Sequence, residues 1–479
     1  MKGFCLALFL AVSVPCFASA QGLTPEQAGR LDAVFSDMQA LDAPGASVAV
    51  IRRGQIIYSK GFGSAQIEYQ VPITPTTVFH VASVSKQFTA MAVLLLVVDG
   101  KLGLDDDIRE HMPDVSDMGA VVTPRHLLHH VSGVRDQWEL LAMAGWRLDD
   151  VITKEHVRRL LLLQEELNFE PGAEYMYSNM GFSLAADLVE RVAGMPFSEF
   201  VDERIFQPLE MHLTHVHDDH EMVVPNRAYS YRETQDGYRN AVLSYANHGA
   251  TSLFTTAEDL VNWLDNFRVQ TVGGPAVLEE MTTRGVLNNG DTIPYALGIG
   301  WGDYRGLRNL GHGGSDAGFR SQVMWFPDHN VGIAVLSNFG SANPGLRARQ
   351  VADVVLGDVL EPAPEPAEAA IAPESEQDQA PVQSNVDLSQ FLGTYYSPEI
   401  ETFYQVREVE SGLVVYHLRF GEIRLVSGPD DDTFLGGQWF LNSLAFTRDA
   451  ASRVDGFRLT GGRVRNLRFV KVATPLPRE

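Results

Sequence analysis

The sequence has 479 residues, with 61 acidic and 37 basic side chains and a formal net charge of −24 at pH 7. This length allows two or three domains with full cores, and the negative charge disfavours nucleic acid as a partner because phosphate backbones would be repelled. Both cysteines, Cys5 and Cys16, precede Gln21. A chain that starts at Gln21 therefore excludes disulfides, thiol catalysis and cysteine zinc sites.

The N-terminus has the pattern of a secretory signal. Lys2 precedes an apolar stretch over residues 4–14, and Ala18-Ser19-Ala20 offers small residues for cleavage. This apolar stretch is too short to span a bilayer comfortably. We expect residues 1–20 to be a signal peptide and the protein to be exported, periplasmic or extracellular, without stable membrane insertion. A retained anchor and a lipid on Cys16 are the alternatives.

Residues 21–360 mix strand and helix patterns. Runs at 47–51 and 56–58 predict one hairpin, and runs at 322–326 and 331–337 predict a second. Helices are expected at 86–98, 124–130, 155–163, 181–192, 199–206 and after Thr256, which precedes Asp259 as a helix cap does. These patterns predict one sheet assembled from chain-distant hairpins, with a helical region packed beside it.

The helix expected at 86–98 opens with Ser83-Val84-Ser85-Lys86. At this spacing the hydroxyl and the amine share one helix face, so the lysine can take or steer the serine proton, and the helix N-terminus adds positive potential. Such a pair is a candidate activated nucleophile. An ordinary helix start also produces this tetrapeptide by chance, so the motif is weak alone.

A second motif, Tyr177-Ser178-Asn179, follows the turn Glu170-Pro171-Gly172. Tyrosine normally titrates at about pH 10, but beside an ammonium its phenolate becomes accessible. Tyr177 could then accept the serine proton and return it to a leaving group, while Asn179 could hydrogen-bond a substrate carbonyl or the lysine. The plainer interpretation is a half-buried aromatic residue followed by a turn residue.

A third motif, His312-Gly313-Gly314-Ser315, precedes the second predicted hairpin. Glycines beside a strand let a substrate approach the backbone, and free N–H groups there can hold a developing oxyanion. A glycine-rich turn with an incidental histidine is the alternative. Ser315 is not expected to be a nucleophile, because its glycine-flanked segment precedes a strand instead of joining a strand to a helix.

The composition changes at residues 361–385, which hold five prolines and six acids but no basic residue. Such a segment cannot bury enough apolar surface to fold, so we expect a self-repelling, extended linker. Residues 386–479 are dense in short β-type runs separated by turn signals. They predict a small all-β domain of barrel or sandwich type.

The three motifs together resemble the penicillin-recognising serine hydrolases, close to class C β-lactamases, DD-peptidases, D-aminopeptidases and related esterases. The resemblance covers about residues 23–357. It extends to further landmarks in the family's order, namely Pro44-Gly45-Ala46-Ser47-Val48-Ala49-Val50, Lys60-Gly61-Phe62-Gly63, Arg125-His126-Leu127-Leu128, Ser132-Gly133, Phe169-Glu170-Pro171-Gly172 and Arg204-Ile205-Phe206. Through Leu392-Gly393-Thr394-Tyr395, the C-terminal domain resembles the lipocalin-like barrel of some relatives.

This resemblance implies an α/β, β-lactamase-like fold, an antiparallel sheet with flanking helices and a helical region. It implies Ser83 as the acylated nucleophile, Lys86 as its proton partner and Tyr177 as general base and acid. Asn179 would contact substrate and lysine. The motif His312, Gly313, Gly314 and Ser315 would line the substrate site, with the backbone N–H groups of Ser83 and Ser315 as the oxyanion hole. No cofactor or metal is implied.

His312 departs from the β-lactamase pattern. Typical β-lactamases carry a lysine there, which helps to hold the substrate carboxylate. A histidine is largely neutral at pH 7 and would bind a carboxylate more weakly. The departure favours peptides, amides or esters as substrates over β-lactams.

Two groups of histidines invite other interpretations. His212, His215, His217 and His220, with Asp218 and Asp219, have strand-like spacing for a zinc site, although a solvated polar loop also explains them. His126, His129 and His130 fall on a predicted helix, where structural packing is expected.

The sequence thus predicts an exported serine hydrolase that forms an acyl-enzyme on Ser83 and cleaves amide or ester bonds in a D-aminoacyl, ester or cell-wall-type substrate. A catalytically silent, penicillin-binding-type sensor or scaffold is the main alternative. A β-lactamase and a metal-dependent hydrolase that uses the histidine cluster rank lower. The expected partner is a small-molecule or peptide substrate, and the sequence leaves the substrate's identity, a homo-oligomer and the role of the C-terminal domain open.

Overall fold

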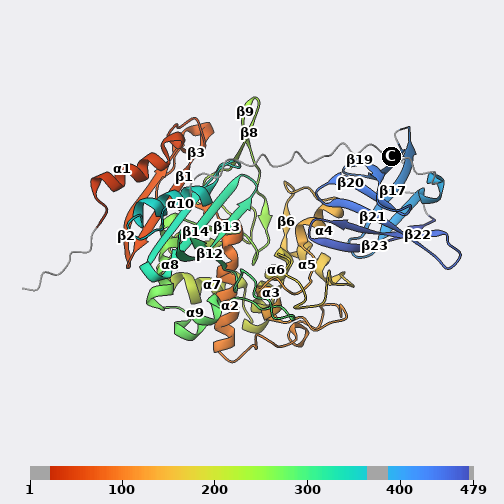
Figure 1. The fold of residues 1–479 in the computed structure, drawn as a ribbon, viewed down its shortest axis with the longest axis horizontal. Helices are drawn as coiled ribbons and strands as arrows, with labels where there is room; N and C mark the ends of the chain where they lie inside the picture. The colour runs from red at the N-terminus through yellow and green to blue at the C-terminus, as the bar shows by residue number, and fades with distance from the viewer. Residues whose placement is uncertain (1–21, 364–386, 411, 474–479) are drawn as a thin grey trace, which may run out of the picture.

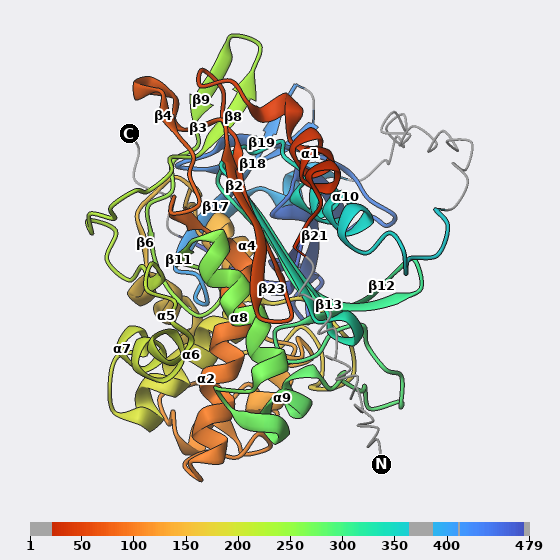
Figure 2. The same ribbon diagram turned by 90° about the vertical axis from the view of Figure 1, so that its left-hand side faces the viewer.

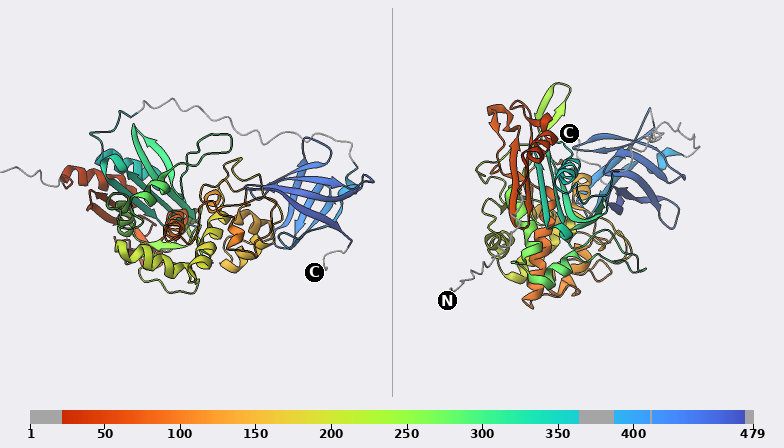
Figure 3. Two further views of the ribbon diagram at one scale, coloured as in Figure 1. Left: turned by 90° about the horizontal axis from the view of Figure 1, so that it is seen from below. Right: turned by 60° about the vertical axis from the view of Figure 1, so that its left-hand side comes forward.

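The structure, a computed structural model, describes residues 22–363, 387–410 and 412–473. The expected signal peptide and most of the expected linker, residues 364–385, lie outside the described residues. A sheet domain lies at one end of the molecule, a helical region in the middle and a C-terminal barrel at the other end (Figure 1; Figure 3).

A six-stranded antiparallel sheet joins the two ends of the first domain. Its strand order is β12 (Gly300–Tyr304), β13 (Leu307–Asp316), β14 (Phe319–Phe326), β15 (Val331–Ser337), β1 (Ala46–Arg52) and β2 (Gln55–Phe62). Both expected hairpins are present, and they pair through β1 and β15, with Ala46 opposite Ser337 and Arg52 opposite Val331. The predicted sheet of chain-distant hairpins is confirmed.

Helices bury both faces of this sheet. In β1, Val48 and Val50 face α1 (Pro25–Val34) and α10 (Pro344–Val355), whereas Ala49 and Ile51 join the larger core against α8 (Ala257–Val269). Figure 2 shows α1 and α10 on the opposite side of the sheet from α8. Because successive side chains of a strand point to opposite faces, burial on both sides explains why β1 is apolar almost throughout.

The helical region is built around α2, whose residues 86–96 are all buried. The bounds are α2 (Lys86–Val98), α3 (Pro124–Leu128), α4 (Gln137–Met143), α5 (Lys154–Leu162), α6 (Asn179–Ala193), α7 (Phe197–Val201) and α9 (Gly274–Thr282). Short strands connect these parts: β3 (Ser64–Gln66), β4 (Val71–Pro72), β5 (Phe79–His80), β6 (Ile152–Thr153), β7 (His215–Val216), β8 (Tyr231–Thr234), β9 (Gly237–Asn240), β10 (Tyr245–Ala246) and β11 (Leu253–Thr255). No helix among the described residues is long and apolar enough to cross a bilayer.

Two predicted helices differ from the structure. The helix expected at 124–130 ends at Leu128, because His130 adopts a φ of 60°, in the left-handed region that stops a helix. The helix expected at 199–206 starts earlier, at Phe197, and changes after Val201 into a π-helical turn over Asp202–Phe206.

The predicted all-β C-terminal domain is a closed antiparallel barrel. Its strands are β16 (Gly393–Ser397), β17 (Thr402–Val409), β18 (Gly412–His417), β19 (Gly421–Ser427), β20 (Thr433–Gln438), β21 (Leu441–Arg448), β22 (Val454–Gly461) and β23 (Val464–Val472). Trp439-Phe440 forms the turn between β20 and β21. Buried aromatic rings pack together in its core, with centroid distances of 4.9 Å for Tyr395–Phe457 and 4.6 Å for Phe457–Phe469.

The barrel docks on the helical region through residues between 135 and 174. The fully buried Arg135 forms an ion pair with the buried Glu399, and it donates to the carbonyl oxygens of Arg465 at 3.3 Å and Asn466 at 3.4 Å. The Tyr404 hydroxyl donates to the Met143 carbonyl oxygen at 2.9 Å. Further ion pairs surround these contacts, among them Arg159–Glu401, Arg419–Asp150, Arg458–Glu166 and Arg465–Glu174.

Candidate active site

Ser83 lies on a 3-10 turn, Ala82–Ser85, that leads directly into α2. Its neighbour Ala82 has a φ of 49°, a left-handed conformation that costs a non-glycine residue about 1–3 kcal/mol. The turn holds the Ser83 hydroxyl at the start of α2, above Lys86, as the sequence motif predicts.

Lys86 is fully buried, and its amine has three polar neighbours. Nζ lies 2.8 Å from the Asn179 Oδ1, 2.8 Å from the Ala250 carbonyl oxygen and 3.1 Å from the Ser83 Oγ. A neutral amine can donate two protons to the first two oxygens, which leaves its lone pair free to accept the Ser83 hydroxyl proton. The geometry therefore suits Lys86 as the group that deprotonates Ser83.

The surroundings of Lys86 favour its neutral form. Burial lowers the pKa of Lys86 to about 7, although the carboxylates of Asp136 and Asp316 act in the opposite direction. Among the described residues, the hydrogen-bond partners of the amine are a hydroxyl, an amide oxygen and a backbone carbonyl, and none is a carboxylate. At pH 7 a large fraction of Lys86 is thus able to accept a proton.

Tyr177 differs from the expectation that its phenolate is accessible. Burial raises the pKa of Tyr177, and a hydrogen bond with Ser83 only partly offsets this rise. The His130 ring packs against the Tyr177 ring, with centroids 4.1 Å apart and the planes tilted by 37°, and its Nδ1 accepts from the Ser178 N–H at 3.1 Å. Tyr177 is therefore protonated at neutral pH, and Lys86 is the better initial proton acceptor.

Asn179 connects Lys86 to a carboxylate that the sequence did not single out. The Asp136 Oδ2 accepts from the Asn179 backbone N–H at 2.6 Å and from its Nδ2 at 2.9 Å, which turns Oδ1 towards Lys86. Asp136 is fully buried and also accepts from the Trp138 N–H as the cap of α4. In the sequence, Asp136 is recognisable only as a candidate helix cap, which is a common position for an aspartate and does not point to an active site.

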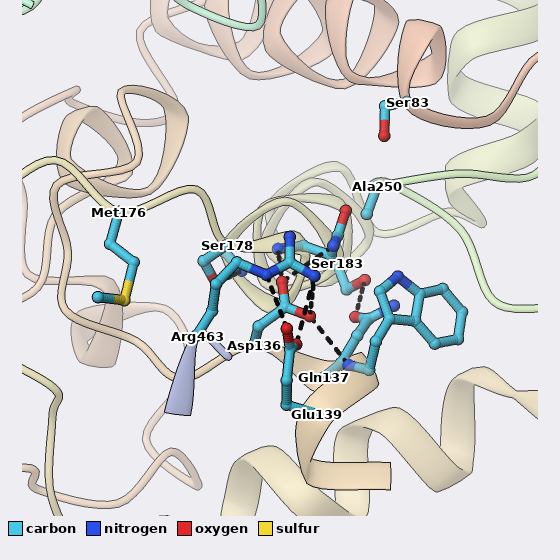
Figure 4. Close-up of polar contacts among 12 residues, drawn as sticks. Ser83, Asp136, Gln137, Glu139, Met176, Ser178, Ser183, Ala250 and Arg463 are labelled. Atoms are coloured by element: carbon cyan, nitrogen blue, oxygen red, sulfur yellow. Dashed lines mark hydrogen bonds and ion pairs between the residues drawn. The ribbon is translucent and has the colours of Figure 1, made fainter. Parts of the chain in front are cut away.

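A residue of the barrel completes this cluster. Arg463, in the turn between β22 and β23, points between two carboxylates of α4 and its cap (Figure 4). Its Nη2 lies 3.2 Å from the Asp136 Oδ1, and its Nε lies 3.0 Å from the Glu139 Oε1. Its guanidinium also lies over the Tyr177 ring, 5.7 Å from the centroid. Sequence patterns marked this segment only as a turn.

The third motif lies on β13, along the cleft. Gly314 passes so close to the turn that carries Ser83 that a Cβ on Gly314 would lie 2.2 Å from the Val81 carbonyl oxygen. The His312 Nδ1 lies 2.6 Å from the Gly313 carbonyl oxygen and must donate to it, so Nε2 accepts from the Tyr295 hydroxyl at 2.9 Å. Burial and the nearby Lys86 lower the pKa of His312 to about 4, so the ring carries no charge at neutral pH.

These groups share one cleft of about 1060 Å³. It brings together Ser83, Tyr177, Asn179, His312, Gly313, Gly314 and Ser315, all expected from the sequence. It is also lined by residues that sequence reasoning missed, including Trp138, Tyr245, Arg320 and, from the barrel, Trp439 and Arg463. Lys86 lies beneath the cleft floor.

The histidines considered for zinc do not converge. The His215 and His217 rings lie against Phe254, with centroid distances of 5.6 and 4.5 Å. Within the described ranges, a different group, Asp187, Glu190 and His248, has metal-ligand proximity. Lys154 already pairs with Glu190 at 3.1 Å, so a basic side chain balances one of the two carboxylates of this group.

The comparisons with known proteins agree with this architecture. A D-aminopeptidase of Gluconobacter oxydans is 28% identical over 336 residues, which is 70% of this chain but only 63% of that relative's length. The octameric penicillin-binding protein homologue of Pyrococcus abyssi covers 92% of this chain with a TM-score of 0.62 at 22% identity, and 99% of that chain is covered. The D-amino acid amidase of Ochrobactrum anthropi covers 70% of this chain with a TM-score of 0.60 at 22% identity, and 99% of that chain is covered.

A family model described as Beta-lactamase matches residues 31–356. This match spans more than half of the chain and contains all three motifs. The chain therefore belongs to the beta-lactamase family.

Proposed function

We propose that the protein is an exported serine hydrolase that cleaves amide bonds, and ester bonds of similar shape, through an acyl-enzyme on Ser83. The observation that carries the proposal is the position of Lys86, a buried amine 3.1 Å from the Ser83 Oγ with two other acceptors for its protons. A serine next to such a base is an activated nucleophile.

In the acylation step, the Ser83 Oγ forms a bond to the substrate carbonyl carbon while its proton passes to the neutral Lys86 amine. The carbonyl oxygen becomes an oxyanion, which the backbone N–H groups of Ser83 and Ser315 would hold. The bond to the leaving amine or alcohol then breaks, and that group receives a proton from the Tyr177 hydroxyl. Lys86 returns its proton to Tyr177, and water later hydrolyses the acyl-enzyme by the reverse proton path.

The relatives support amides as the substrate class. Proteins named D-aminopeptidase and D-amino acid amidase share the family and the fold. The neutral His312 also favours amide substrates over β-lactams, because it offers no positive charge for the carboxylate that β-lactam substrates carry. We therefore place β-lactam hydrolysis below amide and ester hydrolysis.

Intact-mass analysis after treatment with a fluorophosphonate and with a fluorescent penicillin tests the nucleophile. We expect wild type to gain one adduct, Ser83→Ala to gain none, and Ser315→Ala to keep it, because Ser315 contributes only its backbone. An adduct on Ser83→Ala would refute the assignment.

Stoichiometric labelling without product from D-aminoacyl amide, ester and β-lactam substrates would instead support the silent sensor. Activity that survives chelation would exclude the metal-dependent alternative.

Export is part of this proposal and depends on the pattern of residues 1–20. The N-terminal mass of protein recovered from the periplasm or medium should begin at Gln21. A homo-oligomer stays a prediction, which the solution mass tests.

A further inference from the structure

The cluster beneath the cleft contains two buried carboxylates and one cation that binds both. Asp136 is fully buried and Glu139 nearly so, and the Arg463 guanidinium contacts both at 3.2 and 3.0 Å (Figure 4). Burial and the neighbouring Asp136 raise the pKa of Glu139 to about 7. A buried carboxylate needs a cation or a proton nearby.

Two cations compete to balance Asp136. Arg463 contacts it directly, whereas Lys86 reaches it only through the amide of Asn179. An arginine cannot lose its proton in a protein, but a buried lysine can. Because Arg463 supplies the positive charge, Lys86 can be neutral without leaving Asp136 unbalanced.

We propose that Arg463, from the barrel turn, is a positioning residue of the active site: it serves as the counter-ion of Asp136, and so keeps Lys86 free to act as the base for Ser83. This inference rests on the function proposed above and gives the C-terminal barrel a part in it. Without Arg463, Asp136 would lose the cation in direct contact with it and would be linked to Lys86 through the Asn179 amide.

The direction of the effect follows from the charges that face Lys86. Removing the Arg463 cation removes a repulsion and leaves Asp136 to attract the Lys86 proton more strongly, so both changes raise the pKa of Lys86. Asp316 already accepts a hydrogen bond from the Thr251 hydroxyl and contacts His80. The side chains of Tyr177, His130 and His312 are uncharged at neutral pH. The titratable and charged groups around Lys86 and Asp136 are Asp136, Asp316, Arg463, Glu139, Tyr177, His130 and His312. Glu139 loses the same cation when Arg463 is removed, so its pKa also rises, and in its protonated form it adds no attraction for the Lys86 proton.

The chain is well suited to a direct measurement, because it has few lysines. They are Lys2, Lys60, Lys86, Lys101, Lys154 and Lys471. In protein labelled with ¹³C at the lysine ε-carbon, the Lys86 resonance can be assigned as the one absent from Lys86→Met. We expect it to titrate at about pH 7 in wild type and about one pH unit or more higher in Arg463→Gln. The acylation rate at pH 7 should fall about fivefold or more in the same variant and recover towards wild type at higher pH.

Arg465→Gln is the matched control. Arg465 lies two residues away in the same hairpin and pairs with Glu174 on the surface, so its loss removes a docking contact without touching Asp136. Its Lys86 resonance should titrate as in wild type. Arg463→Lys keeps a charge at the site, and its Lys86 pKa should lie nearer to wild type than that of Arg463→Gln. It also provides a folded variant if Arg463→Gln is unstable.

An unchanged Lys86 pKa in Arg463→Gln, or an equal shift in Arg465→Gln, would overturn the inference. A lower acylation rate with the same pH dependence would also overturn it, because a purely structural role predicts that result. Failure of wild type to acylate with any substrate would instead refute the proposed function, and the resonance titration would still decide whether Arg463 controls Lys86.

Discussion

At the scale of single residues, the chemistry depends on whether one buried amine carries a proton. Lys86 must be neutral to accept the Ser83 proton, and burial lowers its pKa to about 7. Of the other possible acceptors for the Ser83 proton, His312 has its pKa lowered to about 4 and Tyr177 has its pKa raised. The pKa of Glu139 is also raised to about 7, but Glu139 contacts Arg463 and not Ser83. Lys86 should therefore be the main group that sets the pH dependence of acylation.

We expect the acylation rate to rise with pH through about pH 7 and to level off above it, because Lys86 is protonated and inactive below its pKa. Stopped-flow acylation with an activated ester between about pH 5 and about pH 9 measures this profile. Lys86→Arg, which is always protonated, should lose about 10² to 10⁴ in rate over the whole range. A flat profile in wild type would contradict this role for Lys86.

At the scale of elements, the width of the cleft depends on how closely β13 approaches the turn that carries Ser83. A Cβ on Gly314 would lie 2.2 Å from the Val81 carbonyl oxygen and 2.3 Å from the Ser321 Oγ, so strand or turn must move. A Cβ on Gly313 would first meet the Gln322 Oε1 at 3.2 Å, the end of a side chain that can adjust. The two neighbouring glycines therefore differ in their tolerance of a methyl group.

Gly314→Ala should lower the acylation rate about a hundredfold, because a shift of about 1 Å misplaces the nucleophile relative to the oxyanion donors. It should also destabilise the protein by about 1–3 kcal/mol. Gly313→Ala serves as the control, with a smaller effect on both quantities. Acylation kinetics and thermal unfolding of the two variants measure the difference, and equal effects would argue against this explanation.

A helix or hairpin can be predicted from this sequence when the residues that determine it lie close together in the chain. The start of α2 and the hairpin of β14 and β15 follow from apolar spacing and turn residues within a few positions. The contact of Asp136 with Arg463 has no such signal, because a capping aspartate and a two-residue turn from another domain meet only after both domains fold. Likewise, the expectation for Tyr177 failed because its burial, which raises its pKa, is a property of tertiary packing.

At the scale of the whole molecule, the barrel holds two consecutive residues of the catalytic domain. Arg135 reaches outward to the buried Glu399, and Asp136 receives Arg463 on the side of the active site. The apolar core runs through both domains without a break. The barrel and the hydrolase domain should therefore unfold together and support one site.

The buried ion pair Arg135–Glu399 offers the sharpest test of this union. Glu399→Ala removes the buried partner of Arg135, whose side chain has no exposed surface, and leaves it only the half-exposed Glu166 at 3.6 Å, which should cost about 3 kcal/mol in the free energy of unfolding. Glu401→Ala, two residues along the chain, removes the partner of Arg159, whose side chain is 70% exposed, and should cost less than about 1 kcal/mol. Urea denaturation gives both values.

Because Arg135 adjoins Asp136, Glu399→Ala should also slow acylation, whereas Glu401→Ala should not. Similar stabilities and rates for the two variants would mean that the barrel is attached to the catalytic domain without supporting it.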